Sequence, residues 1–233
     1  MGRQLRAGQT LIVDGDDTLW ENNVYFETAI EAFIDYLGHS TMSRAQVRAA
    51  LDEVERMNVA RHGYGSAAFT QNLRQCYADL AERQVSPEDI EHVLSLGRRI
   101  AQQPMLLIAG VRETLDYLRQ RHTLTLFTKG HKEEQRLKVE RSGLEGAFHH
   151  TVITHEKDPD AYRSLVQTYG FDPARTWMIG NSPRSDINAS LAAGLRAVFI
   201  PHERTWSLEQ QEVPQADGRL LVLKAFSELS DHF

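Results

Sequence analysis

Two aspartates, Asp14 and Asp16, follow a short apolar run in the segment TLIVDGDDT. The run Thr10–Val13 is β-branched and has no helical period, which predicts a buried strand that opens into a polar loop. A carboxylate suits phosphoryl transfer as a nucleophile, because its acyl phosphate is readily hydrolysed. A second acid two residues on can protonate the leaving alkoxide and later accept a proton from water. We therefore predict that Asp14 is a nucleophile and Asp16 its acid/base partner.

Three further polar residues stand where later strands of the pattern end. Thr128 follows the run TLTLF, Lys157 precedes a predicted helix, and Asp186 lies in GNSPRSD after WMIG. The carboxyl ends of parallel strands meet at one edge of a sheet, so these side chains can converge on the first strand. Phosphoryl transfer needs fixed positive charge and hydrogen-bond donors around the phosphate. We predict that four residues hold phosphate oxygens: Thr128, Lys129, Gly130 and Lys157.

Each of these residues also has a plainer interpretation. Thr128 could simply end a strand, and a single lysine such as Lys157 is more often a solvated surface residue than a ligand. Lys129 and Lys132 remain alternative candidates for the phosphate lysine. Asp186 precedes a predicted helix, so we expect it to be both a helix N-cap and a ligand.

A metal ion is expected among these acids. Carboxylates held close together repel one another unless a cation lies between them, and Mg²⁺ takes oxygen ligands and bridges to phosphate. Asp14 and Asp186 are the predicted carboxylate ligands. The histidines, which include His149, His150 and His155, lack regular ligand spacing, and we expect no zinc site there.

The elements that must position these residues fall into two parts. From Asn23 to about Gln103 the apolar residues recur at helical spacing, with breaks that predict four helices. Beyond Pro104 short helices alternate with extended runs, which predicts a parallel sheet covered on both faces. The expected fold is a Rossmann-like α/β core, residues 1–20 and 108–233, with a small all-helical cap domain inserted at 21–107.

In these motifs the chain resembles the haloacid-dehalogenase-like superfamily, and in particular its phosphoglycolate-phosphatase-like members. The first motif of that superfamily corresponds to the segment VDGDDT at residues 13–18, the second to Thr128, the third to Lys157 and the fourth to GNSPRSD at 180–186. The helical block stands where the family inserts its cap between the first two motifs. A single DxDxT segment is weak evidence, but all four motifs in order at strand ends are strong evidence.

The resemblance implies hydrolysis of a small phosphate monoester with Mg²⁺ through an aspartyl-phosphate intermediate, and a cap that closes to exclude water. It also implies that the Asp16 backbone carbonyl joins Asp14 and Asp186 as a metal ligand. The family usually has an acid after the glycine of its fourth motif, where this chain has Asn181. An amide oxygen can still coordinate Mg²⁺ but brings no charge, so we expect weaker binding and a larger contribution from Asp186.

Arg61, His62 and Tyr64 lie in the glycine-rich break RHGYG of the helical block. If this break is the tip of the cap, these side chains would bind the part of the substrate that is not phosphate. An ordinary surface loop is an equally good interpretation of the same residues.

Composition limits the partners and the compartment. The 233 residues are 41% apolar and 25% charged, with a net charge of -6 and one cysteine. The basic residues are scattered, so we expect no nucleic-acid partner, and no apolar run is long enough for a membrane helix. We expect a cytoplasmic protein that acts on a small phosphorylated metabolite. The sequence does not distinguish a monomer from a homodimer.

Other functions on the same fold stay open. A phosphomutase would differ only in returning the phosphoryl group to a substrate. A catalytically silent binding or regulatory module is favoured only by Asn181, whereas the intact acids argue against it. A dehalogenase needs no leaving-group acid and would not require Asp16. The chain is about twice the length of a response-regulator receiver, and the inserted helical block also argues against that class.

Overall fold

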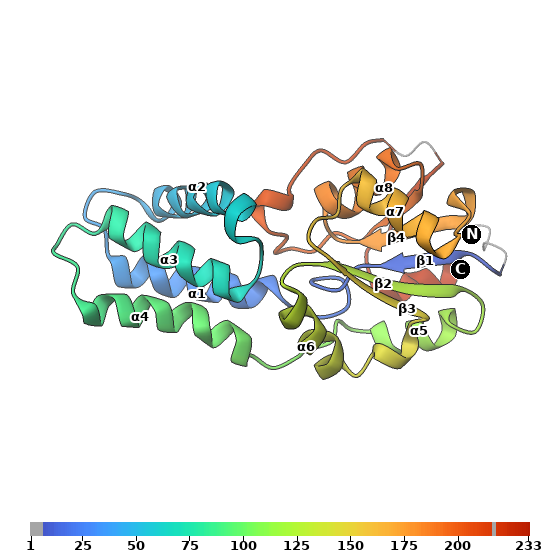
Figure 1. Ribbon diagram of the computed structural model, residues 1–233, viewed down its shortest axis with the longest axis horizontal. Coiled ribbons are helices and arrows are strands. Elements are labelled where there is room, and N and C mark those ends of the chain that lie inside the picture. The colour runs from blue at the N-terminus through green and yellow to red at the C-terminus, as the bar shows by residue number, and fades with distance from the viewer. Residues whose placement is uncertain (1–6, 216–217) are drawn as a thin grey trace. The chain divides into compact units, whose positions relative to one another are not determined.

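The chain divides into two compact units in the computed structural model, which describes residues 7–215 and 218–233. The core unit contains the described residues up to Glu21 together with Met105–Phe233, and the helical unit contains Asn22–Pro104. Figure 1 shows that the chain leaves the core unit after its first strand and returns to it after the four helices. Each unit has its own apolar core.

A six-stranded parallel sheet forms the centre of the core unit among the described residues. The strand order is β3-β2-β1-β4-β5-β6, which places β1 between β2 and β4. In such a sheet, ligands bind beyond the carboxyl ends of the strands where the order reverses, and here that point is β1. The strands are β1 (Thr10–Val13), β2 (Thr123–Lys129), β3 (His150–Thr154), β4 (Thr176–Gly180), β5 (Arg196–Phe199) and β6 (Leu220–Val222).

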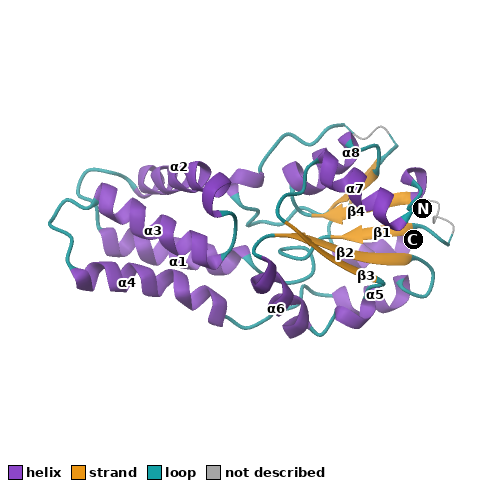
Figure 2. Ribbon diagram, in the orientation of Figure 1, coloured by secondary structure: helices purple, strands orange, loops and turns teal. Residues whose placement is uncertain are grey.

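Helices cover both faces of this sheet, as Figure 2 shows. One face packs against α5, α6 and α9, and the opposite face packs against α7 and α8. Because both faces are covered, Leu11, Ile12 and Val13 of β1 are fully buried, as is typical of a parallel sheet. The helices are α5 (Val111–Leu118), α6 (Lys132–Ser142), α7 (Pro159–Tyr169), α8 (Ala189–Ala192) and α9 (Leu229–His232), and short 3-10 turns span Glu145–Ala147, Pro173–Arg175, Ser207–Glu209 and Phe226–Glu228.

The helical unit contains the four helices that the apolar spacing predicts. Ser43 and Ser86 each cap a helix by accepting a hydrogen bond from the backbone N–H three residues on. Pro87 occupies the first turn of the last helix, where its missing N–H leaves no intrahelical hydrogen bond unmade. The helices are α1 (Asn23–Leu37), α2 (Arg44–His62), α3 (Ser66–Leu80) and α4 (Pro87–Arg98), with a 3-10 turn at Arg99–Gln102.

Two elements of the core unit differ from the sequence prediction. The sequence does not predict the strand β6, and the helix predicted to follow Asp186 begins earlier, as a π-helix at Pro183–Asn188 that continues into α8. The N-cap is therefore Ser182, whose side chain accepts from the Ser185 N–H. Our prediction that Asp186 is the N-cap was wrong, because Pro183 starts the helix three residues before it.

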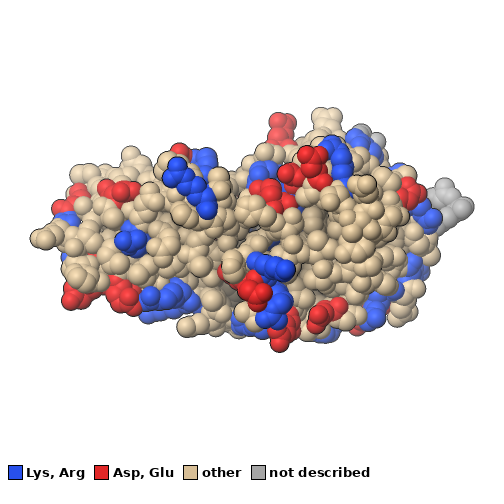
Figure 3. All heavy atoms as spheres, in the orientation of Figure 1, with Lys and Arg blue, Asp and Glu red and all other residues tan. Residues whose placement is uncertain are grey.

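Charged side chains of both signs are mixed over the face of the molecule in Figure 3, and no region of a single sign dominates that face. Within the described part of the chain, no helix combines the length and the apolar character needed to cross a membrane.

Candidate active site

Three adjacent strands bring the predicted residues to one edge of the sheet. Asp14 directly follows β1, Thr128 lies near the end of its neighbour β2, and Asn181 directly follows β4 on the other side. The Asp14 N–H donates to the Ile179 carbonyl at 2.9 Å, which continues the pairing of β1 with β4. The parallel register of the sheet thus fixes the backbone position of Asp14.

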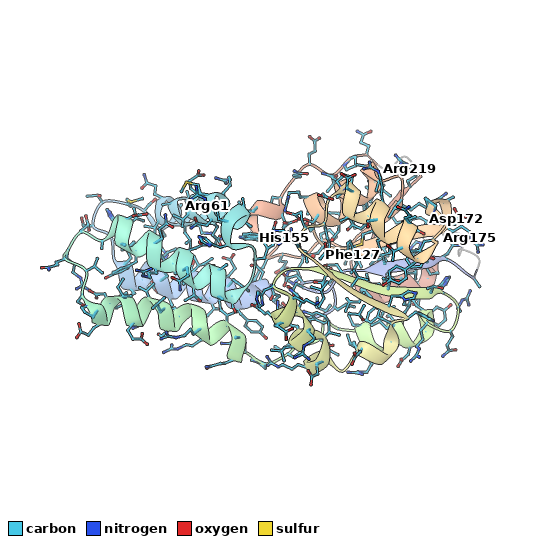
Figure 4. All side chains as sticks on the ribbon, in the orientation of Figure 1. Arg61, Phe127, His155, Asp172, Arg175 and Arg219 are labelled. Atoms are coloured by element: carbon cyan, nitrogen blue, oxygen red, sulfur yellow. The ribbon has the colours of Figure 1, made fainter. Side chains whose placement is uncertain are left out.

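Lys157 lies between two of the predicted acids. Its ammonium group contacts Asp14 Oδ1 and lies 2.9 Å from Asp186 Oδ1. Lys157 is 3% exposed and Asp186 1% exposed, so water does not screen these charges. Lys157 lies above the ring of Phe127, labelled in Figure 4, at 5.7 Å from its centre, and that ring packs against Tyr162 of α7. Of the lysines considered for the phosphate site, Lys157 is the one that contacts Asp14.

The charges of this cluster do not balance. Asp14 and Asp186 carry two negative charges against one positive charge on Lys157. Burial and the neighbouring Asp186 raise the pKa of Asp14 from 3.8 to about 7, although Lys157 acts in the opposite direction. Burial lowers the pKa of Lys157, but the two carboxylates raise it by more, so Lys157 keeps its proton. A bound cation would therefore balance the excess negative charge of this site.

The oxygen atoms beside Asp14 fit a divalent cation. Thr18 Oγ1 lies 3.2 Å from both Asp14 Oδ2 and Asn181 Oδ1. A hydroxyl carries one proton and can donate to only one of these oxygens. Asp14, Asp186 and Asn181 offer only oxygen ligands in a site with excess negative charge, which is the chemistry that Mg²⁺ requires.

The Asp186 carboxylate occupies space that the absence of a side chain at Gly180 leaves free. Asp186 Oδ2 accepts a hydrogen bond from the Ser182 N–H at 3.0 Å. A Cβ atom at position 180 would lie 2.2 Å from the same oxygen, so only glycine leaves space for the carboxylate. The glycine that ends β4 is therefore required by the Asp186 side chain.

Asp16 has its own set of partners. Trp20 Nε1 donates to its Oδ1 at 2.7 Å, Gln135 Nε2 donates to its Oδ2 at 2.8 Å, and the Lys138 ammonium lies within 3.0 Å of both oxygens. Burial would raise the pKa of Asp16, but Lys138 and the two hydrogen bonds lower it below its usual value. The two acids of the first motif thus have opposite environments.

Sequence reasoning missed these partners of Asp16. Gln135 and Lys138 belong to α6, whose sequence KEEQRLKVERS is highly charged and looks like a solvated surface helix. Their spacing of three residues, directly after the second motif, places them on one face of the helix and was the available signal. Gln135 Oε1 also accepts from Thr128 Oγ1 at 3.3 Å.

Lys129 and Gly130 have partners outside the Asp14 cluster. The Lys129 ammonium contacts Glu209, lies 2.8 Å from Ser185 Oγ and 3.3 Å from Glu156 Oε1. The Gly130 N–H donates to the Thr154 carbonyl at 3.0 Å. Their predicted contact with phosphate stays a prediction, whereas Thr128 adjoins the Asp16 partners through Gln135.

A second group of possible metal ligands lies beside the first motif. Oxygen and nitrogen atoms of Asp17, Glu21 and His202 lie within 4.8 Å of one another. His202 Nδ1 accepts from the Arg204 N–H at 3.3 Å, and its Nε2 lies 3.4 Å from Glu21 Oε2. We interpret this group as a hydrogen-bonded cluster, because both ring nitrogens of His202 already have partners within the protein.

The residues predicted at the tip of the helical block lie in the helical unit. Arg61, labelled in Figure 4, and His62 end α2, and Tyr64 lies in the loop before α3. Arg61 and His62 are exposed. Their contact with a substrate stays a prediction.

Comparison with known proteins identifies the family. A family model described as haloacid dehalogenase-like hydrolase matches residues 9–194, which include all four predicted motifs. The protein belongs to this family. The crystal structure of a haloacid dehalogenase-like hydrolase from Xanthomonas campestris superposes on this chain with a TM-score of 0.81. The two sequences are 32% identical, and the match covers 97% of this chain and 94% of the other.

Two curated relatives match this haloacid dehalogenase-like hydrolase over shorter stretches. Phosphoserine phosphatase from Thermus thermophilus is 32% identical over 82 residues, which is 33% of each chain. Human N-acylneuraminate-9-phosphatase is 30% identical over 118 residues, or 48% of each chain. The matches thus span from a third to about half of the length of these relatives.

Proposed function

We propose that this haloacid dehalogenase-like hydrolase is a Mg²⁺-dependent phosphatase that hydrolyses a small phosphate monoester through an aspartyl phosphate at Asp14. The observation that carries the proposal is the buried Asp14 carboxylate in contact with Lys157, with a second acid, Asp16, two residues away. A nucleophile, a fixed cation and a proton donor are the parts that such a transfer requires.

In the first step, an oxygen of Asp14 attacks phosphorus while the bond from phosphorus to the leaving oxygen breaks. The protonated form of Asp16 gives its proton to that leaving oxygen, and the alcohol departs. Lys157 and the Thr128 hydroxyl stabilise the charge that spreads over the phosphoryl oxygens. Because Lys157 is already held by two buried acids, it needs no rearrangement to supply its charge.

In the second step, water attacks the phosphorus of the aspartyl phosphate. The Asp16 carboxylate accepts a proton from this water, and the bond between phosphorus and Asp14 breaks. Inorganic phosphate leaves, and both aspartates return to their starting forms. The same residue thus acts as an acid in the first step and as a base in the second.

The side chains of Asp14, Asp186 and Asn181 and the Asp16 carbonyl would hold Mg²⁺. When bound, the ion supplies positive charge that orients the phosphate and balances the excess of buried acid. Asn181 contributes an uncharged oxygen, and we propose that Asp186 carries more of the binding.

Two observations favour phosphate ester hydrolysis over the other activities of the family. The curated relatives above are phosphatases by name, although the matches cover half of them or less. Asp16 is a leaving-group acid, which a dehalogenase would not require. We also propose a cytoplasmic location and a small phosphorylated metabolite as substrate, with the helical unit as the cap that selects it.

The proposal is tested by hydrolysis of p-nitrophenyl phosphate with Mg²⁺, with EDTA, and by Asp14→Asn. We expect release of p-nitrophenolate that requires Mg²⁺ and disappears in the variant. Borohydride reduction of enzyme quenched during turnover should convert position 14 to homoserine, which mass spectrometry detects. Folded wild-type protein with no release would contradict the phosphatase and favour a mutase or a silent module. Unchanged kinetics of Arg61→Ala and Tyr64→Phe on several substrates would contradict the prediction that these side chains contact the substrate.

A further inference from the structure

The Asp16 carboxylate is held by donors from two segments of the core unit. Trp20, four residues on, donates to Oδ1 at 2.7 Å, and Gln135 of α6 donates to Oδ2 at 2.8 Å. The Lys138 ammonium lies 3.0 Å from Oδ1 and 2.8 Å from Oδ2. Both oxygens therefore have two donors each, which fixes the plane and the direction of the carboxylate.

Gln135 connects Asp16 to the second motif. Its Oε1 accepts from Thr128 Oγ1 at 3.3 Å while its Nε2 donates to Asp16. Gln135 is 4% exposed, so its amide is largely shielded from solvent. A Cβ atom at Gly130 would lie 3.1 Å from Gln135 Nε2, which means that the glycine leaves room for this amide. One side chain thus sets the spacing between the acid and the predicted phosphate-binding hydroxyl.

Lys138 differs from Arg136 of the same helix, and Glu134 also lies 3.9 Å from its ammonium group. The Lys138 side chain is 15% exposed and faces Asp16, whereas that of Arg136 is 55% exposed and pairs only with acids of the same helix, Glu133 and Glu140. A partly buried ammonium beside a carboxylate is screened little by solvent. Lys138 therefore holds the Asp16 carboxylate in place, and Arg136 provides a matched control on the same helix.

We infer that Lys138 and Gln135 are positioning residues that aim Asp16 for proton transfer to the leaving group. The inference rests on the proposed phosphatase activity. When the O–H bond of protonated Asp16 breaks and the new O–H bond forms on the leaving oxygen, Asp16 becomes a carboxylate. Lys138, Gln135 and Trp20 then surround that carboxylate, so the donors that orient the acid also stabilise the product of its proton transfer.

Two substrates of similar shape separate this role from a structural one. Phenyl phosphate and p-nitrophenyl phosphate differ mainly in the basicity of the leaving oxygen, and only the more basic phenolate strongly needs a proton. The ratio kcat/KM reports steps up to release of the alcohol, so it isolates the transfer in which Asp16 is the acid. General acid catalysis contributes about 10²–10⁴-fold to such a step.

We expect Lys138→Met and Gln135→Leu to lower kcat/KM for phenyl phosphate by about 30-fold and that for p-nitrophenyl phosphate by less than about 3-fold. Asp16→Asn should show the same asymmetry with a larger loss, Lys138→Arg should recover part of it, and Arg136→Met should leave both substrates unchanged. Equal losses on both substrates, or none on either, would overturn the inference while leaving the phosphatase proposal intact. A wild-type enzyme inactive on both would contradict the phosphatase proposal and the inference with it.

A spectroscopic measurement tests the contact itself without activity. The indole N–H resonance of Trp20 should shift in Asp16→Asn and in Lys138→Met, because its hydrogen-bond acceptor changes or moves. The resonances of Trp177 and Trp206 serve as internal references. If the Trp20 resonance stays unchanged in both variants, the arrangement around Asp16 does not exist in solution and the inference is wrong.

Discussion

Replacing the proposed nucleophile should make the metal-free protein more stable. Asp14 and Asp186 are buried with a single cation, Lys157, and the cluster has an excess negative charge. Asp14→Asn removes that excess with almost no change in volume and leaves one acid paired with one lysine. The free energy of unfolding in EDTA at pH 8 should therefore rise, because an uncompensated buried charge is costly.

The magnitude follows from the pKa of Asp14, which burial and Asp186 raise from 3.8 to about 7. Each unit of pKa corresponds to about 1.4 kcal/mol, so the ceiling is about 4 kcal/mol, and relaxation around the site lowers the expected gain to about 1–3 kcal/mol. Between these two pKa values the folded protein keeps a proton that the unfolded chain loses. Wild-type stability thus falls as the pH rises from 3.8 to about 7, and the variant does not share this loss.

Urea unfolding of both proteins from pH 4 to pH 8 in EDTA measures the effect. The difference in unfolding free energy between the two proteins should increase as the pH rises from 4 to about 7 and stay constant above that pH. Added Mg²⁺ should stabilise the wild type more than the variant, which lacks a ligand. A variant that is less stable than the wild type at pH 8 in EDTA would refute the reasoning, because Lys157 would then need both carboxylates.

Three further substitutions test other parts of the site. Lys157→Met leaves two buried carboxylates without their cation, so urea unfolding at pH 8 should show a loss of about 3–5 kcal/mol, and less at pH 5, where one of them takes up a proton. Burial would raise the pKa of Glu209, but Lys129 and its other partners lower it to about 2, so Glu209 stabilises the fold above pH 4.5 and this contribution disappears as the pH falls toward 2. Glu209→Gln should flatten the fall in urea midpoint over that interval, and an unchanged slope would contradict the ion pair. Gly180→Ala brings a methyl group to 2.2 Å from Asp186 Oδ2, and thermal unfolding and phosphatase assays should show both lower stability and lost activity.

The parts of the fold that the sequence predicts are those with a strong local pattern. The run Leu11–Val13 is apolar throughout because both faces of β1 are covered, and Ser86 followed by Pro87 marks the start of α4. The strand β6 has only three residues, Leu220–Val222, and no period can be recognised in so short a run. The π-helix at Pro183–Asn188 has one extra residue in its turn, and single residues carry no propensity that distinguishes it from an α-helix.

The candidate site also contains some residues that the sequence predicts and some that it does not. The acids and Lys157 could be predicted because they follow strands, and the ends of parallel strands meet. Lys138 and Glu209 could not, because each lies on an element whose sequence looks like solvated surface, a charged helix in one case and a 3-10 turn in the other. Their burial depends on which elements pack beside them, and a single sequence contains no direct record of that packing.

The two acids of the first motif are two residues apart, and their surroundings drive their pKa values in opposite directions. Burial and Asp186 favour the protonated form of Asp14, whereas Lys138 and two hydrogen bonds overcome burial and favour the charged form of Asp16. A nucleophile must be charged and a general acid protonated, so this is the reverse of what the proposed first step requires. A divalent cation beside Asp14 would favour its charged form, and the negative charge of a substrate phosphate beside Asp16 would favour its protonation. In the proposed mechanism, cation and substrate are therefore both needed before Asp14 is charged and Asp16 protonated at the same time.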